Sequence, residues 1–273
     1  MARKCVTQFL PWLLPLRKKQ RRLCTYAKMR LDGNRYADEQ STQPLPYLLF
    51  ETRCPLLNRN TGFDMVYQEN KAFNVRLAAA TLDKLLIRPR ETFSFWWRVR
   101  HADRITPYKD ALAEVNGKLT TQPGGGLCQI SNLLNWMFLH TPLTPLERHG
   151  HAIKYFPEPP SDAPMGVDAT VSEGWLDLRV RNDTGVCFQI ALDFDDAHII
   201  GRILTDVDTG VSYRVYNGEP SYYAQGDAIY EEVDVYRDTL DKAAGEKRGT
   251  EHLYQNRCRV VYPLPDDTPV RNR

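Results

Sequence analysis

The chain has 273 residues, 42% of them hydrophobic and 11% aromatic, which is enough to bury a sizeable core. Its formal net charge of +2 predicts no general affinity for nucleic acid or membranes. The cysteines show no Cys-x-x-Cys pair, which excludes a small disulfide scaffold and a zinc ribbon; they are Cys5, Cys24, Cys54, Cys128, Cys187 and Cys258.

The first 35 residues are strongly basic, with ten Lys or Arg against one acidic residue, Asp32. The apolar run at 9–16 is too short to cross a bilayer, contains two prolines and lacks a small-residue cleavage site. We therefore expect no secretory signal and a cytoplasmic protein. Two interpretations stay open for residues 1–35: helices that pack on the domain, or a peripheral contact of Trp12 and the leucines with the inner face of the membrane.

Three regions follow from composition and periodicity. Residues 1–60 form a basic N-terminal segment of helix and loop, 61–205 a core domain, and 206–273 a β-rich C-terminal extension and tail. The core is expected to contain a helix at 65–87, stopped by Pro89, and strands at 186–194 and 198–204 around the Asp195-Asp196 turn. The fold class predicted is α+β with a mostly antiparallel sheet.

The most informative motif is Gly124-Gly125-Gly126, followed by Cys128 at the start of an amphipathic helix over 129–139. Glycines allow positive φ angles and a close approach of the backbone to a neighbour. Unpaired N–H groups and the helix dipole stabilise a thiolate at a helix N-terminus. Cys128 is therefore a candidate nucleophile, and the loop amides together with Gln129 are candidate donors to an oxyanion.

Candidate partners for the thiol come next in the chain. His149 and His151 precede a predicted strand at 152–156 and are expected to share one face of it. Asp168 begins a second predicted strand at 166–171, and a third is expected at 174–180. Thiolate, imidazole base and orienting carboxylate occur in this order in many thiol enzymes. Which histidine faces the thiol stays open, and Glu147 and Asp162 compete with Asp168 for the carboxylate role.

With these motifs in this order, the stretch 88–182 resembles the VanW family, whose name comes from an accessory gene in some glycopeptide-resistance clusters. Arg90 stands where this resemblance predicts glycine, and Trp96-Trp97 stand where it predicts more polar residues. The resemblance implies a link to cell-wall peptide metabolism, without an established activity. The pieces that carry it are 89–95, 108–111, 115–118, 124–131, 147–151 and 167–170.

Three functions fit these residues, so whether the protein is an enzyme stays open. The first is a cysteine-dependent hydrolase or acyl-transferase on cell-wall peptide or its precursor, with a papain- or transglutaminase-like arrangement of Cys128, His149 or His151, and Asp168, and without a cofactor. The second is zinc binding by Cys128, His149, His151 and Asp168. The third is a non-enzymatic module in which the glycine loop holds a carboxylate of a wall peptide. No feature indicates a nucleotide or nucleic-acid site.

Overall fold

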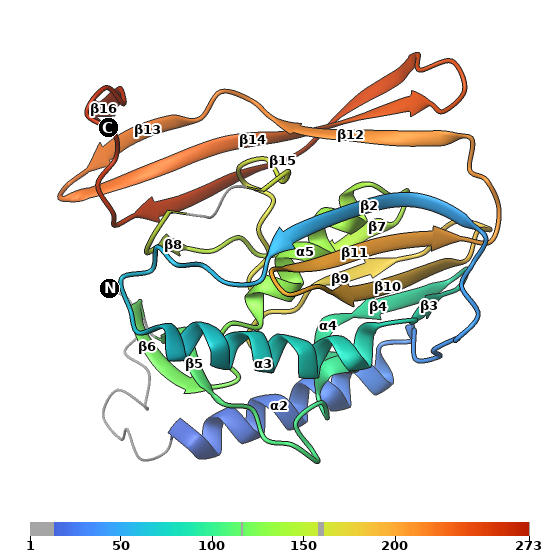
Figure 1. Ribbon diagram of the computed structural model, residues 1–273, viewed down its shortest axis with the longest axis horizontal. Coiled ribbons are helices and arrows are strands. Elements are labelled where there is room, and N and C mark those ends of the chain that lie inside the picture. The colour runs from blue at the N-terminus through green and yellow to red at the C-terminus, as the bar shows by residue number, and fades with distance from the viewer. Residues whose placement is uncertain (1–13, 116, 158–160, 273) are drawn as a thin grey trace.

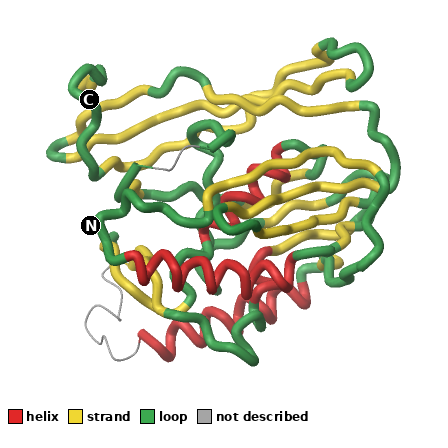
Figure 2. Tube along the Cα trace, viewed as in Figure 1, coloured by secondary structure: helices red, strands yellow, loops and turns green. Residues whose placement is uncertain are grey.

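The computed structural model describes residues 14–115, 117–157 and 161–272. Four helices and sixteen strands are defined within these residues (Figures 1 and 2). The helices are α2 (Leu14–Leu31), α3 (Met65–Leu82), α4 (Phe95–Val99) and α5 (Cys128–Leu139). The strands are β1 (Arg35–Tyr36), β2 (Tyr47–Pro55), β3 (Leu86–Ile87), β4 (Glu91–Ser94), β5 (Asp110–Val115), β6 (Lys118–Pro123), β7 (Thr144–Glu147), β8 (Ile153–Lys154), β9 (Arg179–Arg181), β10 (Phe188–Phe194), β11 (His198–Thr205), β12 (Val211–Asn217), β13 (Ser221–Gln225), β14 (Ala228–Asp241), β15 (Lys247–Val260) and β16 (Val270–Asn272).

The central sheet has the order β2-β11-β10-β3, and all its pairs are antiparallel. Along β11 every second residue is buried, which is the burial pattern of a strand with one covered face. Helix α3 packs against the same core and is capped by the preceding Asp64, whose carboxylate accepts a hydrogen bond from the Val66 N–H. It ends at Leu82, five residues before the predicted end, since 86–87 form β3 instead.

Helix α5 lies between the central core and a second, outer sheet (Figure 1). Five apolar α5 side chains join the main core with α3, β10 and β11: Ile130, Leu133, Leu134, Met137 and Phe138. Trp136 and Leu139 join a smaller cluster with Val215 and Val235 of the outer sheet. A helix that is apolar on two faces is the expected result of burial on both sides. Cys128, the first residue of α5, packs against the main core.

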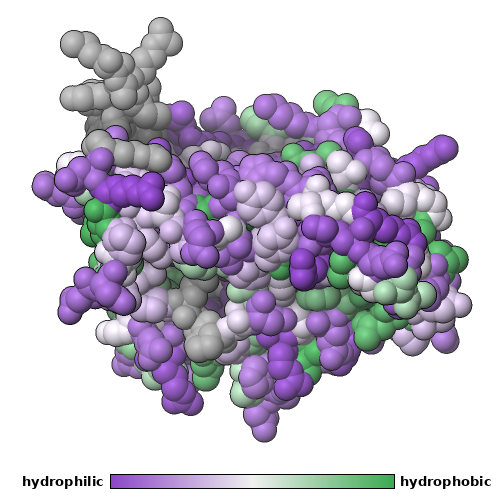
Figure 3. Space-filling model, turned by 90° about the horizontal axis from the view of Figure 1, so that it is seen from above, coloured by the Kyte–Doolittle hydropathy of each residue, from purple (hydrophilic) through white to green (hydrophobic). Residues whose placement is uncertain are grey.

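The outer sheet is built on β14, which pairs with β12, β13 and β15, while β16 and β8 extend its edges. The polar stretch at 238–248 is the end of a long β14–β15 hairpin, and the predicted tail instead pairs with β13 through β16. Polar residues at these positions are consistent with strands that have one face in water. The face of the molecule over this sheet is mainly hydrophilic (Figure 3).

The α+β class with mostly antiparallel sheets is confirmed. Three sequence-predicted strands are shorter or absent: 152–156 reduces to β8, 174–180 contributes only its end to β9, and 166–171 is not a strand. The reason is visible at 166–171, where backbone groups bond to α5 side chains rather than to a strand. Asn132 accepts from the Ala169 N–H, Ser131 donates to Ala169 O, and Asn135 donates to Val167 O.

The domain boundaries at 60/61 and 205/206 stay predictions, although β2 shows that the first region contributes a strand to the central sheet. Arg90 has a φ of +67°, in the left-handed region that favours glycine. The residue that departs from the family pattern thus occupies a turn that glycine would enter without strain. In the described residues, every helix is too short or too polar to span a bilayer.

Candidate active site

The glycine loop before Cys128 packs tightly against the chain itself. A Cβ on Gly125 would lie 2.1 Å from Ala111 O, and one on Gly126 would lie 2.1 Å from Lys71 Cγ. Gly124 and Gly126 have φ values of +77° and +85°. Asn74 holds the loop from α3 by donating to Gly125 O at 3.1 Å. The glycine loop therefore does approach another group closely, as expected from the sequence, but this group is the chain itself. These contacts fix the start of α5.

Cys128 is half-buried at the first turn of α5. Its Sγ lies 3.5 Å from Thr170 Oγ1 and 3.8 Å from the Val171 carbonyl oxygen. The thiol also hydrogen-bonds to the His151 ring. Segment 166–171 therefore supplies a hydroxyl and a carbonyl to the sulfur atom, and His151, from the loop before β8, supplies the imidazole.

His151 connects the thiol to Asp168. Its Nδ1 lies 2.7 Å from Asp168 Oδ2, and its backbone N–H donates to the same oxygen at 2.6 Å. Because Nδ1–H is held by the carboxylate, Nε2 is the ring nitrogen left for the sulfur. The structure thus brings together Cys128, His151 and Asp168 in the order thiol, imidazole, carboxylate.

Arg148, which is not among the residues predicted for the site, holds Asp168 in place. Its Nη2 donates to Asp168 Oδ1 at 3.2 Å and to Gly166 O at 2.7 Å, and its Nε donates to Asp168 O at 2.7 Å. Asn256 of β15 donates to Asp168 Oδ1 at 3.4 Å. Arg148 lies three residues before His151, so the motif itself could have indicated its role. Asn256 lies too far along the chain for its sequence position to predict a contact with Asp168.

The electrostatics of this group are those of an ion pair. Burial alone would raise the pKa of the Cys128 thiol, but the His151 hydrogen bond and charge bring it below the ordinary value of 9.0. Burial likewise opposes protonation of His151, yet Asp168 and Cys128 raise its pKa well above 6.5. The pKa of Asp168 is lowered despite burial, because His151 and Arg148 stabilise the carboxylate. Both shifts act in the direction that favours a thiolate–imidazolium pair.

His149 does not share a face with His151, because residues 148–152 are loop and the alternation of a strand does not apply. Its Nε2 lies 3.1 Å from Glu147 Oε1, so the Glu147 carboxylate, a competitor for the triad, pairs with the other histidine. The His149 carbonyl accepts from the Thr170 N–H at 2.7 Å, which helps to place Thr170 at the sulfur. Asp162, the second competitor, accepts from Thr52 Oγ1.

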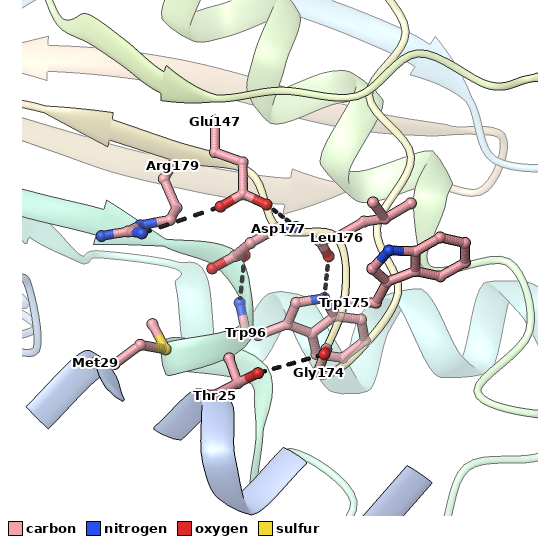
Figure 4. A pocket seen from close by; sticks show the side chains of 9 residues that line it. All are labelled: Thr25, Met29, Trp96, Glu147, Gly174, Trp175, Leu176, Asp177 and Arg179. Carbon is pink, nitrogen blue, oxygen red and sulfur yellow. Dashed lines mark hydrogen bonds and ion pairs between the residues drawn. The ribbon is translucent and has the colours of Figure 1, made fainter. Parts of the chain in front are cut away.

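Glu147 also lines a separate cavity of about 70 Å³, together with Asp177, Arg179 and Trp96 (Figure 4). Asp177 accepts hydrogen bonds from Ser94 Oγ and from the Trp96 N–H. Burial, aided by the Glu147 charge, raises the pKa of Asp177 to about 6. The residues around Cys128 do not line this cavity.

Several of the candidate oxyanion donors are already used within the chain. The amides of Gly124 and Gly125 donate to Lys109 O and Gln122 O, and the Gln129 side chain donates to Pro55 O at 2.6 Å. The Gln129 N–H donates to Gly126 O. These positions therefore do not serve as free donors, for the physical reason that the turn itself needs them. The Cys128 and Gly126 amides have no acceptor in the described part of the chain.

The predicted zinc ligands do not gather around one point. His149 turns to Glu147, and both oxygens of Asp168 are occupied by His151 and Arg148. Across 14–115, 117–157 and 161–272, no three His, Cys, Asp or Glu side chains are arranged to hold a metal ion. The four candidate side chains therefore divide into a thiol group of three and a separate histidine–glutamate pair.

Comparison with known proteins gives one matching family model, described as VanW like protein, over residues 70–204. The chain is 54% identical to the vancomycin B-type resistance protein VanW of Enterococcus faecalis over 99% of its length and 98% of that protein. It is 35% identical to the uncharacterized protein YoaR of Bacillus subtilis over 116 residues, which are 42% of this chain and 36% of that protein. No solved structure matches.

Proposed function

The chain belongs to the VanW family, and from this membership and the site geometry we propose that it is a cysteine-dependent acyl-thioester enzyme acting on cell-wall peptide material. One observation carries the proposal: His151 bridges the Cys128 thiol and the Asp168 carboxylate at the start of a buried helix. A thiol, imidazole and carboxylate in this arrangement resemble those of papain- and transglutaminase-like enzymes.

In the first step, the Cys128 thiolate attacks the carbonyl carbon of a peptide or amide bond. A C–S bond forms, and the carbonyl electron pair moves onto oxygen. As the tetrahedral intermediate collapses, the C–N bond breaks and the His151 imidazolium gives its Nε2 proton to the departing amine. Asp168 keeps the Nδ1–H pointing at itself throughout, so the reacting nitrogen faces the sulfur.

In the second step, water or an acceptor amine attacks the thioester carbonyl, and His151 takes the proton from this nucleophile. The C–S bond breaks and the thiolate is restored, which returns the imidazolium–thiolate pair. Hydrolysis results from water, and transpeptidation or amidation from an amine. All three outcomes use the same acyl-thioester.

The oxyanion of each intermediate needs donors close to Cys128. The Cys128 N–H is the best placed of these, because the neighbouring Gly124, Gly125 and Gln129 amides are engaged elsewhere. The positive end of the α5 dipole adds to the stabilisation of both thiolate and oxyanion. The Gly126 N–H is the second available donor, whereas Gly124 and Gly125 contribute by fixing this first turn.

A role in vancomycin-type resistance is part of the proposal, since the enterococcal relative carries that name. The substrate class is a wall peptide or its precursor. We infer a cytoplasmic site of action at the inner face of the membrane, where precursors are assembled before export.

The proposal is tested by the alkylation rate of each cysteine against pH, mapped by mass spectrometry. Cys128 is expected to react with a midpoint below 9.0, because its thiol pKa is lowered. Burial raises the thiol pKa of Cys54 and Cys187 to about 11 and that of Cys258 to about 12. The exposed Cys24 is replaced by serine so that its accessibility does not mask the result.

A synthetic wall stem peptide then tests turnover, with the acyl-enzyme detected by intact mass. Cys128→Ser is expected to lower turnover by about three orders of magnitude or more, whereas the matched Cys187→Ser variant keeps it. Binding that survives Cys128→Ser without any turnover would favour a non-enzymatic module. Reactivity of Cys128 that appears only after chelation would favour zinc, and an inert Cys128 in both conditions would end the nucleophile proposal.

A further inference from the structure

Helix α2 has two faces with different surroundings. On its inner face, Met29 is 5% exposed, Thr25 donates to Gly174 O and Tyr26 donates to Glu173. A Cβ on Gly174 would lie 3.0 Å from the Arg22 backbone, so the helix is packed directly on the 172–177 loop. These contacts hold α2 firmly on the outside of the molecule, at the opposite end from the outer sheet (Figure 1).

The outer face of α2 presents exposed leucines that nothing in the described chain covers. Leu16, Leu23 and Leu31 are 65%, 62% and 86% exposed. With 3.6 residues per turn, these three leucines fall on the side opposite Met29, together with Cys24, Ala27 and one polar residue, Gln20. Exposed leucines scattered singly need no explanation, but a line of them along one helix face does.

Basic residues border this apolar line on both sides. The helix contains seven Lys or Arg and no acidic residue. Lys19 and Arg30 fall on one flank of the leucines, and Arg17, Arg21 and Lys28 on the other. An apolar stripe between two basic rows is the arrangement by which a helix lies in the headgroup region of an anionic bilayer.

A tryptophan lies beside the same helix. Trp175 is 70% exposed, and the Arg21 guanidinium carbon is 5.8 Å from its ring centre. Tryptophan is favoured at the boundary between headgroups and acyl chains, because its ring is amphipathic. Trp175 belongs to the 172–177 loop, which directly follows the Val171 carbonyl at the Cys128 sulfur.

We propose that α2 is a membrane-docking helix, whose leucine face enters an anionic phospholipid surface while its basic flanks contact the headgroups. This surface is independent of the thiol chemistry, so it stands even if Cys128 proves inert. Charge complementarity selects the occupant: a positive helix without acidic residues favours anionic lipid over a second copy of the same positive helix.

The test is co-sedimentation of the full chain with vesicles that contain phosphatidylglycerol, compared with pure phosphatidylcholine vesicles. The wild type is expected to bind the anionic vesicles and to be released by salt. Leu16→Glu with Leu23→Glu should lower the partition about tenfold or more, since both side chains are already exposed and folding is undisturbed. Lys19→Gln and Lys28→Gln should each lower it about fivefold.

Matched controls use exposed residues elsewhere. Ile105→Glu replaces a side chain that is 95% exposed, and Lys118→Gln removes an exposed charge from β6; both should bind as the wild type does. An environment-sensitive dye on the exposed Cys24 should shift to the blue with anionic vesicles, also in a Cys128→Ser background.

Two results would overturn the docking proposal. The first is equal binding of the wild type and the double leucine variant to anionic vesicles. The second is an absence of vesicle binding together with a dimer in sedimentation that the leucine substitutions dissociate, which would make this face an interface between copies. Loss of turnover with intact vesicle binding would instead count only against the proposed enzyme.

Discussion

Two aspartates, Asp168 and Asp177, are both buried, at 7% and 9% exposed, and both contact the segment 147–151. Their pKa values nevertheless shift in opposite directions from the ordinary value of 3.8. Asp168 is bound by a guanidinium and an imidazole, and its pKa is lowered. Asp177 is bound by a hydroxyl and two backbone N–H groups, and burial raises its pKa to about 6. Neutral hydrogen bonds do not offset desolvation here, whereas opposite charges do.

The largest expected effect comes from removing the charge of Asp168. Asp168→Asn would place an amide NH₂ against two His151 donors or against Arg148, and would leave the guanidinium without a counter-charge. We expect a loss of about 3–5 kcal/mol in the free energy of unfolding, measured by urea titration at neutral pH.

Asp177→Asn is the matched substitution in the other site. The asparagine oxygen can keep both backbone bonds, and the Ser94 hydroxyl can rotate to accept from the new NH₂. No loss of stability is expected at neutral pH. Equal losses for the two variants would show that charge is not what distinguishes the sites.

The next effect is a pH dependence carried by Asp177. Its pKa is higher in the folded state than the ordinary 3.8, so its favourable contribution is complete below 3.8 and is lost as the pH rises to about 6. At ~1.4 kcal/mol per pKa unit, the change is about 3 kcal/mol. The wild type should therefore lose unfolding free energy relative to Asp177→Asn as the pH rises between these values. Above them, the difference between the two proteins should stay constant.

A second substitution pair separates the two histidines. His151→Ala should return the Cys128 thiol pKa toward or above 9.0, because the hydrogen bond and positive charge that lower it are gone. The alkylation rate of Cys128 at pH 7 is expected to fall about tenfold or more. His149→Ala should leave this rate unchanged, since its ring contacts Glu147; a comparable fall in both variants would contradict the assignment of His151.

The smallest effect is expected for Arg148→Lys. A lysine keeps the positive charge beside Asp168 but cannot reach Asp168 Oδ1, Asp168 O and Gly166 O together. The loss should be about 1 kcal/mol in unfolding free energy, with the Cys128 alkylation profile retained. A loss as large as that of Asp168→Asn would mean that the fork of hydrogen bonds, rather than the charge, holds the carboxylate.

The sequence was sufficient for the parts of this site that depend on local periodicity. Helix α5 and the thiol at its first residue follow from the apolar spacing after the glycines, and the order of thiol, imidazole and carboxylate was readable. The choice between His149 and His151 was not, because their expected shared face required strand geometry at the two histidines, where the chain forms a loop before β8. Alternating residue types at 166–171 suggested another strand, whereas the backbone there is held by Ser131, Asn132 and Asn135 of α5.

The contact of the outer sheet with the Asp168 segment has a consequence for how such chains can be recombined. A Cβ on Gly166 would lie 2.7 Å from Val233, the Arg148 guanidinium stacks 4.3 Å from the Tyr254 ring centre, and Asn256 reaches Asp168 itself. The strands after residue 205 thus contact the residues that hold Asp168 and form part of the surroundings of the thiol site. A chimera that exchanges them between relatives would have to carry the matching residues on both sides of the junction, so the two parts are expected to be inherited together.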